Sequence, residues 1–371
     1  MKLFTGLALC GLGLTTAIFS VQGCSSDPAT TGDGGTSTGG ASKRPPGKEG
    51  AATTSTDLKY YALKTIQLGD TDRGGAPSQT AWKSYGYDID GVASTATSAD
   101  HCKLKGGAPT KVKADGTDGT DNSFGANILP IITTASPDAA KSINDSLLKG
   151  TFTVIIETKG LNAEATQTNT GLSGQLFAGG EMAAPPKWDG NDEWSVLPAL
   201  LADGKSVAGG SKVKFGDSYV NKGVFVSGSD ATVTLSLSIQ GASLDLNINK
   251  ATISFKKPAG ADINATEGTI AGVLGTEQLI SELRKVAGRV STTLCEGSTF
   301  DNIAAQIRQA SDIGANGANA AAGECDGISI GIGFTATAVK PPTKVVPPGP
   351  VGADPCKATP DAGPADAPSG G

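Results

Sequence analysis

The chain has 371 residues, of which 38% are apolar, only 18% are charged and 52 are glycine. This composition argues against a coiled coil or helical bundle, which would need far more Leu, Glu, Lys and Arg. A formal net charge of −6 provides no basic footprint for nucleic acid, and the single histidine, His101, argues against a histidine-rich zinc site.

Residues 1–23 are predicted to be a lipoprotein signal peptide. Lys2 precedes an apolar run from Leu3 to Phe19, which has the length of a signal-peptide core and is marginal for a membrane span. The run closes at Gly23-Cys24, which resembles the lipobox of bacterial lipoproteins, where the chain is cut before the cysteine. The alternative is an ordinary secretory peptide with an incidental cysteine.

The lipobox resemblance implies that Cys24 carries a diacylglycerol anchor with palmitate-type acyl chains. Ser25 follows in place of the aspartate that favours inner-membrane retention, so the resemblance implies delivery to the outer membrane, facing either the periplasm or the outside. Residues 24–56 are rich in Gly, Ser and Thr, and we predict a disordered linker. Residues 341–371, rich in Pro, Ala and Gly, are predicted to form a disordered tail.

The body, residues 57–340, mostly shows the two-residue alternation of half-buried strands. Such alternation is typical of antiparallel rather than parallel sheets. It is clearest where Ile328, Ile330, Ile332 and Phe334 alternate with small or polar residues. The expected strands lie in residues 58–68, 85–89, 151–158, 212–255 and 328–334.

Three segments have helical signals. Ser136-Pro137 opens a helix that Gly150 ends, a second helix runs from Thr276 to about Val290, and a third begins at Ser298. The sequence therefore predicts a mainly β fold, a large antiparallel β-sandwich of jelly-roll type with a few late α-helices packed on it.

Two acidic segments are candidate calcium ligands. Calcium needs several oxygen ligands on a tightly turning backbone, which glycines such as Gly116 and Gly119 permit. The spacing is not that of an EF-hand, and the alternative is a solvated turn. The candidate ligands are Asp88, Asp90, Asp115, Asp118, Asp121 and Asn122.

A third acidic segment contains two of the three tryptophans. Exposed tryptophan beside acids and amides can stack on sugar rings, so this loop is a candidate ligand-binding site. The alternative is that the indoles fill one end of the sandwich while the acids form a turn. The candidate residues are Trp188, Asp189, Asp192 and Trp194.

Four cysteines remain after signal removal and lipidation, and an even number in an exported chain predicts two disulfides with three possible pairings. Cys295 and Cys325 flank the third helix and make the shortest loop, so we expect them to pair. Cys102 would then join Cys356 and tie the tail to the body.

Taken together, these features resemble a family. The lipobox, the D-x-D-G and D-G-T-D-N-S-F-G segments, the W-D-G-N-D-E-W loop and the late cysteines are similar to those of a large paralogous set of lipoproteins in myxobacterial genomes. The resemblance covers roughly residues 57–340. It implies an envelope location and a β-rich body, but no activity or functional residues.

Three functions fit these features. The favoured one is a non-catalytic, lipid-anchored surface module that binds a glycan, matrix component or envelope protein, with calcium as its only candidate cofactor. The alternatives are a purely structural envelope lipoprotein and, third, a polysaccharide hydrolase that uses paired carboxylates. The carboxylates available for such a pair are Glu157, Glu181, Asp192 and Glu193.

Overall fold

The computed structural model describes residues 42–228, 231–239, 242–295, 297–349 and 354–357. The predicted signal peptide, the lipidation site Cys24 and most of the predicted linker and tail lie outside the described residues. Among the described residues, no helix has the length and apolar content needed to cross a bilayer.

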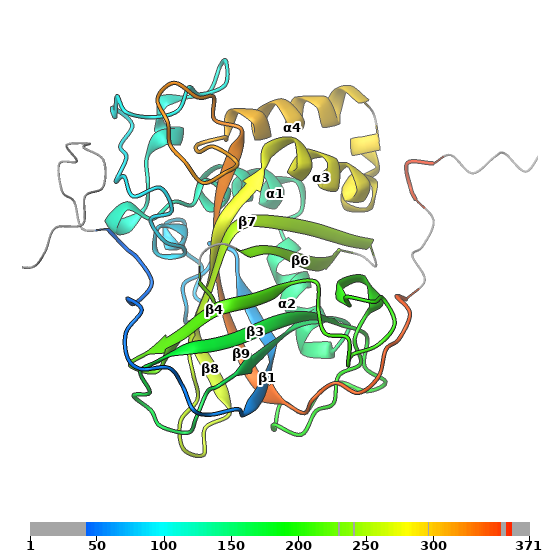
Figure 1. The fold of residues 1–371 in the computed structure, drawn as a ribbon. Coiled ribbons are helices and arrows are strands. Elements are labelled where there is room, and N and C mark those ends of the chain that lie inside the picture. Colours follow the sequence, from blue (N-terminus) through cyan, green and yellow to red (C-terminus); the bar gives the residue numbers. More distant parts are fainter. Residues whose placement is uncertain (1–41, 229–230, 240–241, 296, 350–353, 358–371) are drawn as a thin grey trace, which may run out of the picture. The chain divides into compact units, whose positions relative to one another are not determined.

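An antiparallel sheet closes on itself to form a barrel of eight strands (Figure 1). Neighbouring strands around the ring follow the order β5-β4-β3-β2-β1-β9-β8-β7, and β5 pairs with β7 to close it. A further strand, β6, pairs with β7 outside the ring. The strands are β1 (Leu58–Gln67), β2 (Thr153–Lys159), β3 (Asn169–Gly179), β4 (Lys214–Asn221), β5 (Val224–Val226), β6 (Ala231–Ile239), β7 (Ala242–Lys256), β8 (Asn264–Gly275) and β9 (Gly327–Val339).

The mainly β prediction is confirmed, but the sandwich is replaced by a closed barrel. The closing contact joins β5 to β7, where Phe225 lies opposite Phe255 with their rings 5.0 Å apart. Alternation of apolar and polar residues shows which face of a strand is buried, and it does so equally in a sandwich and a barrel. The sequence pattern therefore could not distinguish the two.

Apolar side chains fill the barrel largely as the alternation predicts. Ile328, Ile330, Ile332 and Phe334 of β9 are all fully buried in the main core. Within β1 the alternation is interrupted: Tyr61 and Leu63 face the main core before, and Ile66 after, a shift in the pairing with β9 between Leu63 and Thr65. This irregularity changes the side that each later side chain faces.

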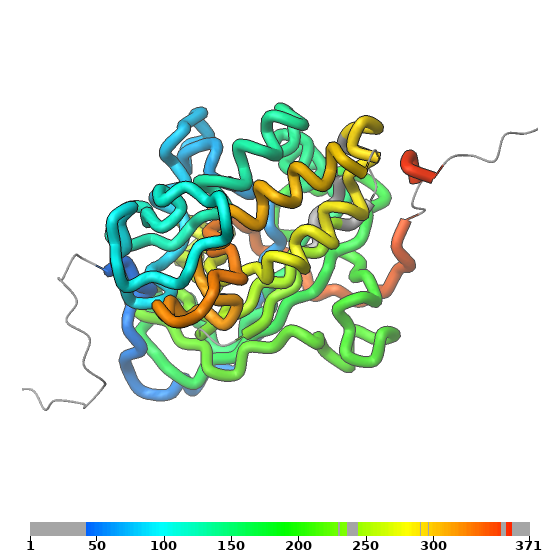
Figure 2. The backbone as a smooth tube through the Cα atoms, turned by 90° about the horizontal axis from the view of Figure 1, so that it is seen from above, coloured from blue at the N-terminus to red at the C-terminus, as the bar shows by residue number. Residues whose placement is uncertain are grey.

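Helices lie against the barrel on one side, and α3 runs beside α4 (Figure 2). The three predicted helices are confirmed to within a few residues, and Gly150 ends α2 in the left-handed conformation with φ of 78°. A π-helical turn and α1 were not predicted. The helices are the π-turn (Phe124–Ile128), α1 (Leu129–Ala135), α2 (Ala139–Lys149), α3 (Thr276–Val290) and α4 (Gly297–Gln309).

The segment 42–53, here called the N-terminal strap, lies along the barrel, although we predicted it as part of a disordered linker. The Tyr219 hydroxyl donates to the Pro46 carbonyl at 2.7 Å. The Thr53 N–H donates to the Thr170 carbonyl at 2.8 Å. Main-chain groups of a polar segment can thus be ordered by the barrel without an apolar core of their own.

Part of the predicted tail is also ordered. The Val196 N–H donates to the Lys344 carbonyl at 2.8 Å, and the Val346 N–H donates to the Val196 carbonyl at 3.0 Å. Farther on, Cys356 forms a disulfide. Residues 341–346 therefore pack against the loop that follows β3.

Candidate metal centre

Three aspartates from two loops meet beside the barrel. Asp88, Asp90 and Asp121, here called the aspartate cluster, each offer a carboxylate oxygen, and these three oxygens lie within 4.8 Å of one another. Asp88 and Asp121 are only 4% and 3% exposed, and Asp90 is half-buried. The two acidic segments identified in the sequence therefore converge.

Glycines in β9 allow the first loop to lie directly on the barrel. A Cβ atom on Gly331 would lie 2.2 Å from the Tyr85 carbonyl oxygen, and one on Gly333 would lie 2.5 Å from the Tyr85 ring. The Tyr87 hydroxyl shares a 2.5 Å hydrogen bond with Ser254 of β7. Residues 85–89, predicted as a strand, are instead a buried loop whose position is set by these contacts.

Asn122 holds the second loop against the same strand. Its side-chain N–H groups donate to the carbonyls of Trp82, Tyr85 and Gly331, and its carbonyl oxygen accepts from the N–H groups of Gly125 and Gly331. Asn122 is 2% exposed. With both ends of its amide occupied by main-chain groups, it positions Asp121 and is not a metal ligand.

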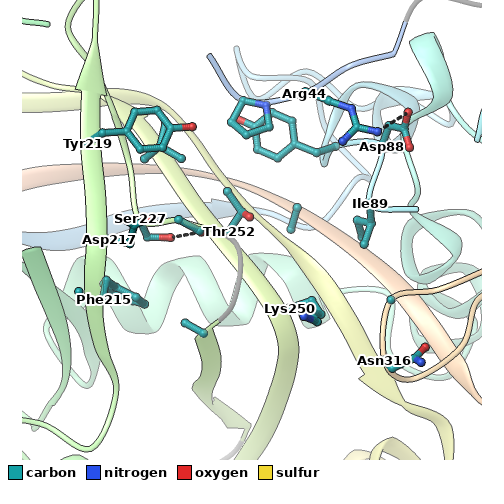
Figure 3. Close-up of a pocket in the computed structure, with 18 of the residues that line it drawn as sticks. Arg44, Asp88, Ile89, Phe215, Asp217, Tyr219, Ser227, Lys250, Thr252 and Asn316 are labelled. Carbon is teal, nitrogen blue, oxygen red and sulfur yellow. Dashed lines mark hydrogen bonds and ion pairs between the residues drawn. The ribbon is translucent and has the colours of Figure 1, made fainter. Parts of the chain in front are cut away.

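The N-terminal strap reaches the cluster from outside. The Ser42 hydroxyl donates to Asp88, and the Arg44 guanidinium lies 3.8 Å from the same carboxylate (Figure 3). The Asp88 side chain is fully covered, whereas that of Arg44 is 57% exposed. Arg44 is thus a peripheral partner and not a buried counter-ion.

Main-chain N–H groups fix the orientation of the carboxylates. Asp88 accepts from the Gly91 N–H at 2.6 Å, and Oδ2 of Asp121 accepts from the Ile89 N–H at 2.6 Å. No described residue donates a hydrogen bond to Oδ1 of Asp121. This buried aspartate therefore keeps one oxygen available to a ligand within the cluster.

The surroundings of these carboxylates disfavour their ionised form and raise their pKa values. Burial raises the pKa of Asp90, and burial together with neighbouring carboxylates raises that of Asp115 to about 8. Burial, followed by the charges of Asp90 and Asp115, also holds the pKa of Asp121 well above its usual range. A bound divalent cation would offset these repulsions.

The spacing of the oxygens fits calcium. Calcium–oxygen bonds are about 2.3–2.6 Å long, so two ligands of one ion lie at most about 5 Å apart. The three oxygens of the aspartate cluster meet that condition. An all-oxygen set of ligands also suits calcium or magnesium better than zinc. Calcium takes six to eight ligands, so water or main-chain carbonyls would complete the shell.

The remaining predicted ligands lie outside the cluster. Asp118 is exposed, and its main-chain carbonyl accepts from the Lys43 N–H at 2.7 Å. Asp115 accepts a hydrogen bond from the Ser94 N–H, and its negative charge helps to raise the pKa of Asp121. The structure therefore brings together three of the six predicted ligands.

A fourth buried carboxylate near the cluster was missed. Asp312 is 7% exposed and accepts hydrogen bonds from both the N–H and the hydroxyl of Ser329. Burial raises its pKa to about 7, and the charge of Asp90 adds to this shift. Asp312 lies just after α4, in a short segment whose N–H groups bond to the Gly327 carbonyl, and no spacing or motif in the sequence distinguishes it.

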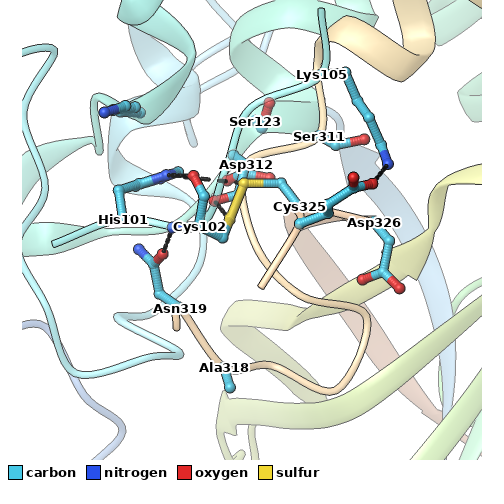
Figure 4. The surroundings of a disulfide bond; sticks show 12 residues. His101, Cys102, Lys105, Ser123, Ser311, Asp312, Ala318, Asn319, Cys325 and Asp326 are labelled. Atoms are coloured by element: carbon cyan, nitrogen blue, oxygen red, sulfur yellow. Dashed lines mark hydrogen bonds and ion pairs between the residues drawn. A yellow bond between two sulfur atoms is a disulfide. The ribbon is translucent and has the colours of Figure 1, made fainter. Parts of the chain in front are cut away.

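The four predicted cysteines are all in disulfides, but the predicted pairing is wrong. Cys102 pairs with Cys325 (Figure 4), and Cys295 pairs with Cys356. His101 lies beside the first bond, with Nδ1 donating to the Cys102 carbonyl at 2.9 Å. Burial lowers the pKa of His101, so its ring adds no positive charge at neutral pH.

The tryptophan loop has the arrangement of the structural alternative. Trp194 is fully buried in a second apolar cluster, and its ring centroid lies 6.1 Å from that of Trp188. Asp192 accepts from the N–H groups of Lys187 and Trp188, so it stabilises the turn. Asp189 likewise accepts from the Asn191 N–H. The loop offers no pair of exposed indoles to a sugar.

Comparison with known proteins gave no family assignment: no protein-family model, curated protein or solved structure matches this chain.

Proposed function

We propose that this protein is a non-catalytic, lipid-anchored envelope module whose aspartate cluster binds calcium. One observation carries the proposal: three carboxylate oxygens, two of them from nearly covered aspartates, converge within the span of one calcium shell. Burial, with the charges of neighbouring carboxylates, raises the pKa values of Asp90 and Asp121, and a bound divalent cation would offset the cost of keeping these groups ionised.

Calcium would join three segments that have no regular secondary structure in common. Asp88 and Asp90 belong to the loop on β9, and Asp121 belongs to the segment fixed by Asn122. The N-terminal strap contacts Asp88 through Ser42. An ion at this point would order a surface built from loops, and binding residues in proteins often lie on such loops held by a rigid scaffold.

The envelope location rests on the sequence alone. The apolar run that ends at Gly23-Cys24 supports lipidation of Cys24 and an outer-membrane anchor. The test is the Cys24→Ser chain, which should lose membrane association. A variant that still fractionates with the outer membrane at the wild-type level would contradict the anchor.

A non-catalytic role is favoured over hydrolysis because three of the four candidate carboxylates already have structural partners. Glu157 accepts a hydrogen bond from Gln175 at 2.8 Å, and Asp192 accepts two main-chain N–H groups. Glu193 accepts from the Thr343 hydroxyl. Each of these groups has a structural partner, and an acid–base pair needs carboxylates directed at one bond.

Thermal unfolding in excess chelator and in millimolar calcium tests the metal site. At tenfold excess over Kd, binding adds about 1.4 kcal/mol, which is a rise of a few degrees in Tm for a domain of this size. Asp121→Asn should abolish the rise. Asp90→Asn, at a less buried position, provides a second variant should the first fail to fold.

Asp118→Asn is the matched control. Asp118 is an exposed aspartate only three residues from Asp121, and its φ of 54° is one that asparagine tolerates. This variant should keep the full calcium response. Identical melts of the unaltered chain in chelator and calcium, or loss of the response in Asp118→Asn alone, would overturn the proposed site.

A further inference from the structure

The wall of the barrel is incomplete between β4 and β6. The short strand β5 joins β4 over only three residue pairs, from Asn221 opposite Val224 to Tyr219 opposite Val226. Both β5 and β6 pair with the same edge of β7, because β8 takes the other edge. The far edge of β6 therefore faces the side on which β4 lies (Figure 1). Among the described residues, no strand pairs with that edge of β6, or with β4 ahead of Tyr219 on the side facing it.

The free edge of β4 offers main-chain groups to a partner. The Val213 carbonyl accepts from the Leu176 N–H at 3.1 Å, at the start of the pairing with β3. Main-chain groups alternate in direction along an antiparallel strand, so those of Lys214 and Gly216 point away from β3. Both residues are exposed, and a Cβ atom on Gly216 would meet no atom within 4 Å. The edge is therefore open to an approaching chain.

A cleft of about 770 Å³ lies beside this edge (Figure 3). Its volume is in the usual range for a ligand site. Residues 214–217 of β4 line it, together with the side chains of Ile89, Tyr219 and Val226. An extended peptide that adds a strand to a sheet gains affinity from main-chain hydrogen bonds and specificity from contacts of its alternate side chains. The opening provides both a free edge and apolar surface next to it.

We propose that this opening binds an extended peptide segment of another envelope protein, which adds a strand to the free edge of β4 on the side facing β6. The inference rests on the proposed role as a binding module, but not on the calcium site. Lys214 is exposed and has no ion pair among the described residues, so it favours an acidic residue in the peptide. Residues 231–239 of β6 include no charged residue, which favours an otherwise uncharged peptide.

Other occupants fit this opening less well. The segments of this chain outside the described residues are rich in glycine before Ser42, and after Lys357 they contain Pro360, Pro364 and Pro368. Glycine and proline both disfavour strands. In a second copy, every strand already belongs to its own sheet, and the free edge of β6 faces its own opening. A segment of a different protein remains the best match.

The experiment measures binding of a fluorescein-labelled, capped hexapeptide, Thr-Val-Thr-Val-Thr-Glu, to the full-length chain in detergent by fluorescence anisotropy. Gly216→Pro removes the N–H that points away from β3 and leaves the pairing with β3 in place, so Kd should rise about fivefold or more. Gly216→Ala is the matched control. It keeps the N–H, its Cβ has open space, and Kd should stay unchanged.

Changes in the peptide provide a test that does not depend on the folding of Gly216→Pro. Methylating alternate main-chain nitrogens removes the donors along one edge of the peptide, so one of the two alternate sets should raise Kd at least about tenfold. Exchanging the glutamate for lysine should weaken binding severalfold, and Lys214→Glu should reverse that preference.

Several outcomes would overturn the inference. Equal affinity for the unmodified peptide and both methylated sets, or equal affinity in Gly216→Pro and Gly216→Ala, would show that the edge of β4 is not used. A dimer of the unaltered chain that dissociates in Gly216→Pro, seen by light scattering, would place a second copy in the opening. Absence of peptide binding with an intact calcium response would refute the opening and leave the metal site standing, whereas absence of both would refute the proposed function as well.

Discussion

Replacing Asn122 separates a structural role from a ligand role at the candidate metal centre. The side chain makes five hydrogen bonds, all to main-chain groups of four residues: Trp82, Tyr85, Gly125 and Gly331. Asn122→Ala removes all five. If Asn122 positions the loops, stability should already fall in chelator, and the rise produced by calcium should shrink as well because Asp121 loses its position.

The magnitude follows from the number of bonds. A hydrogen bond contributes about 1 kcal/mol net, and leaving a buried partner unpaired costs at least as much. Five such bonds correspond to about 5 kcal/mol, a large share of the usual 5–15 kcal/mol for a whole domain. At roughly 2–4 °C per kcal/mol, Tm should fall by about 10–20 °C.

Asn122→Asp provides a second measurement with nearly the same side-chain volume. The carboxylate keeps an acceptor for Gly125 and Gly331, but its other oxygen would face three carbonyls to which Asn122 donates. Chemical unfolding of both variants, with and without calcium, is the assay. A loss below about 1 kcal/mol, or a loss seen only in calcium, would refute the structural role.

Three further predictions concern the surroundings of the cluster. Gly331→Ala should cost about 1–3 kcal/mol and weaken the calcium response, because its Cβ would lie 2.2 Å from the Tyr85 carbonyl; unaltered melts would contradict this. Replacing Cys102 and Cys325 by serine should cost about 2–5 kcal/mol, and unreduced peptide mapping should link these two residues and not either one to another cysteine. Burial raises the pKa of Asp312 to about 7, so in chelator the wild type should lose up to about 4 kcal/mol as pH rises from about 4 through 7. Asp312→Asn should flatten that profile in urea unfolding, and an unchanged slope would show that the carboxyl is not the cause.

Local patterns predicted the elements well where one face of a strand is buried and the other is polar. The strand 328–334 and the helix Thr276–Val290 lie where alternation and helical spacing place them. Strands β3 and β8 were missed, since glycine and buried residues on both faces obscure the period in each. Closure of the barrel depends on the short strand β5, and no local pattern records which strand it joins.

The sequence predicted only those residues of the candidate site whose immediate neighbours form a recognisable turn pattern. Glycine beside aspartate marked the loops that hold Asp88 and Asp121. Their convergence depends on Asn122 and Gly331, which are 209 residues apart in the sequence and bond to each other. Asp312 had no neighbouring signal at all. Contacts between distant segments arise from packing, which a single sequence does not display.

The cysteine pairing shows how weak the sequence criterion was. The shortest loop predicts the pair Cys295 and Cys325, whereas the bonded residues Cys102 and Cys325 are separated by 223 residues. In the chain-entropy description, closing a loop of this length rather than one of about 30 residues changes the free energy by only about 2 kcal/mol. Native packing readily outweighs that difference. The Lys103 N–H donates to the Gly323 carbonyl at 2.8 Å, and the Cys325 N–H donates to the Lys103 carbonyl at 3.0 Å. These main-chain hydrogen bonds bring Cys102 close to Cys325 independently of the disulfide. The disulfide thus follows from the fold, and it fixes the loop that carries His101 beside the aspartates.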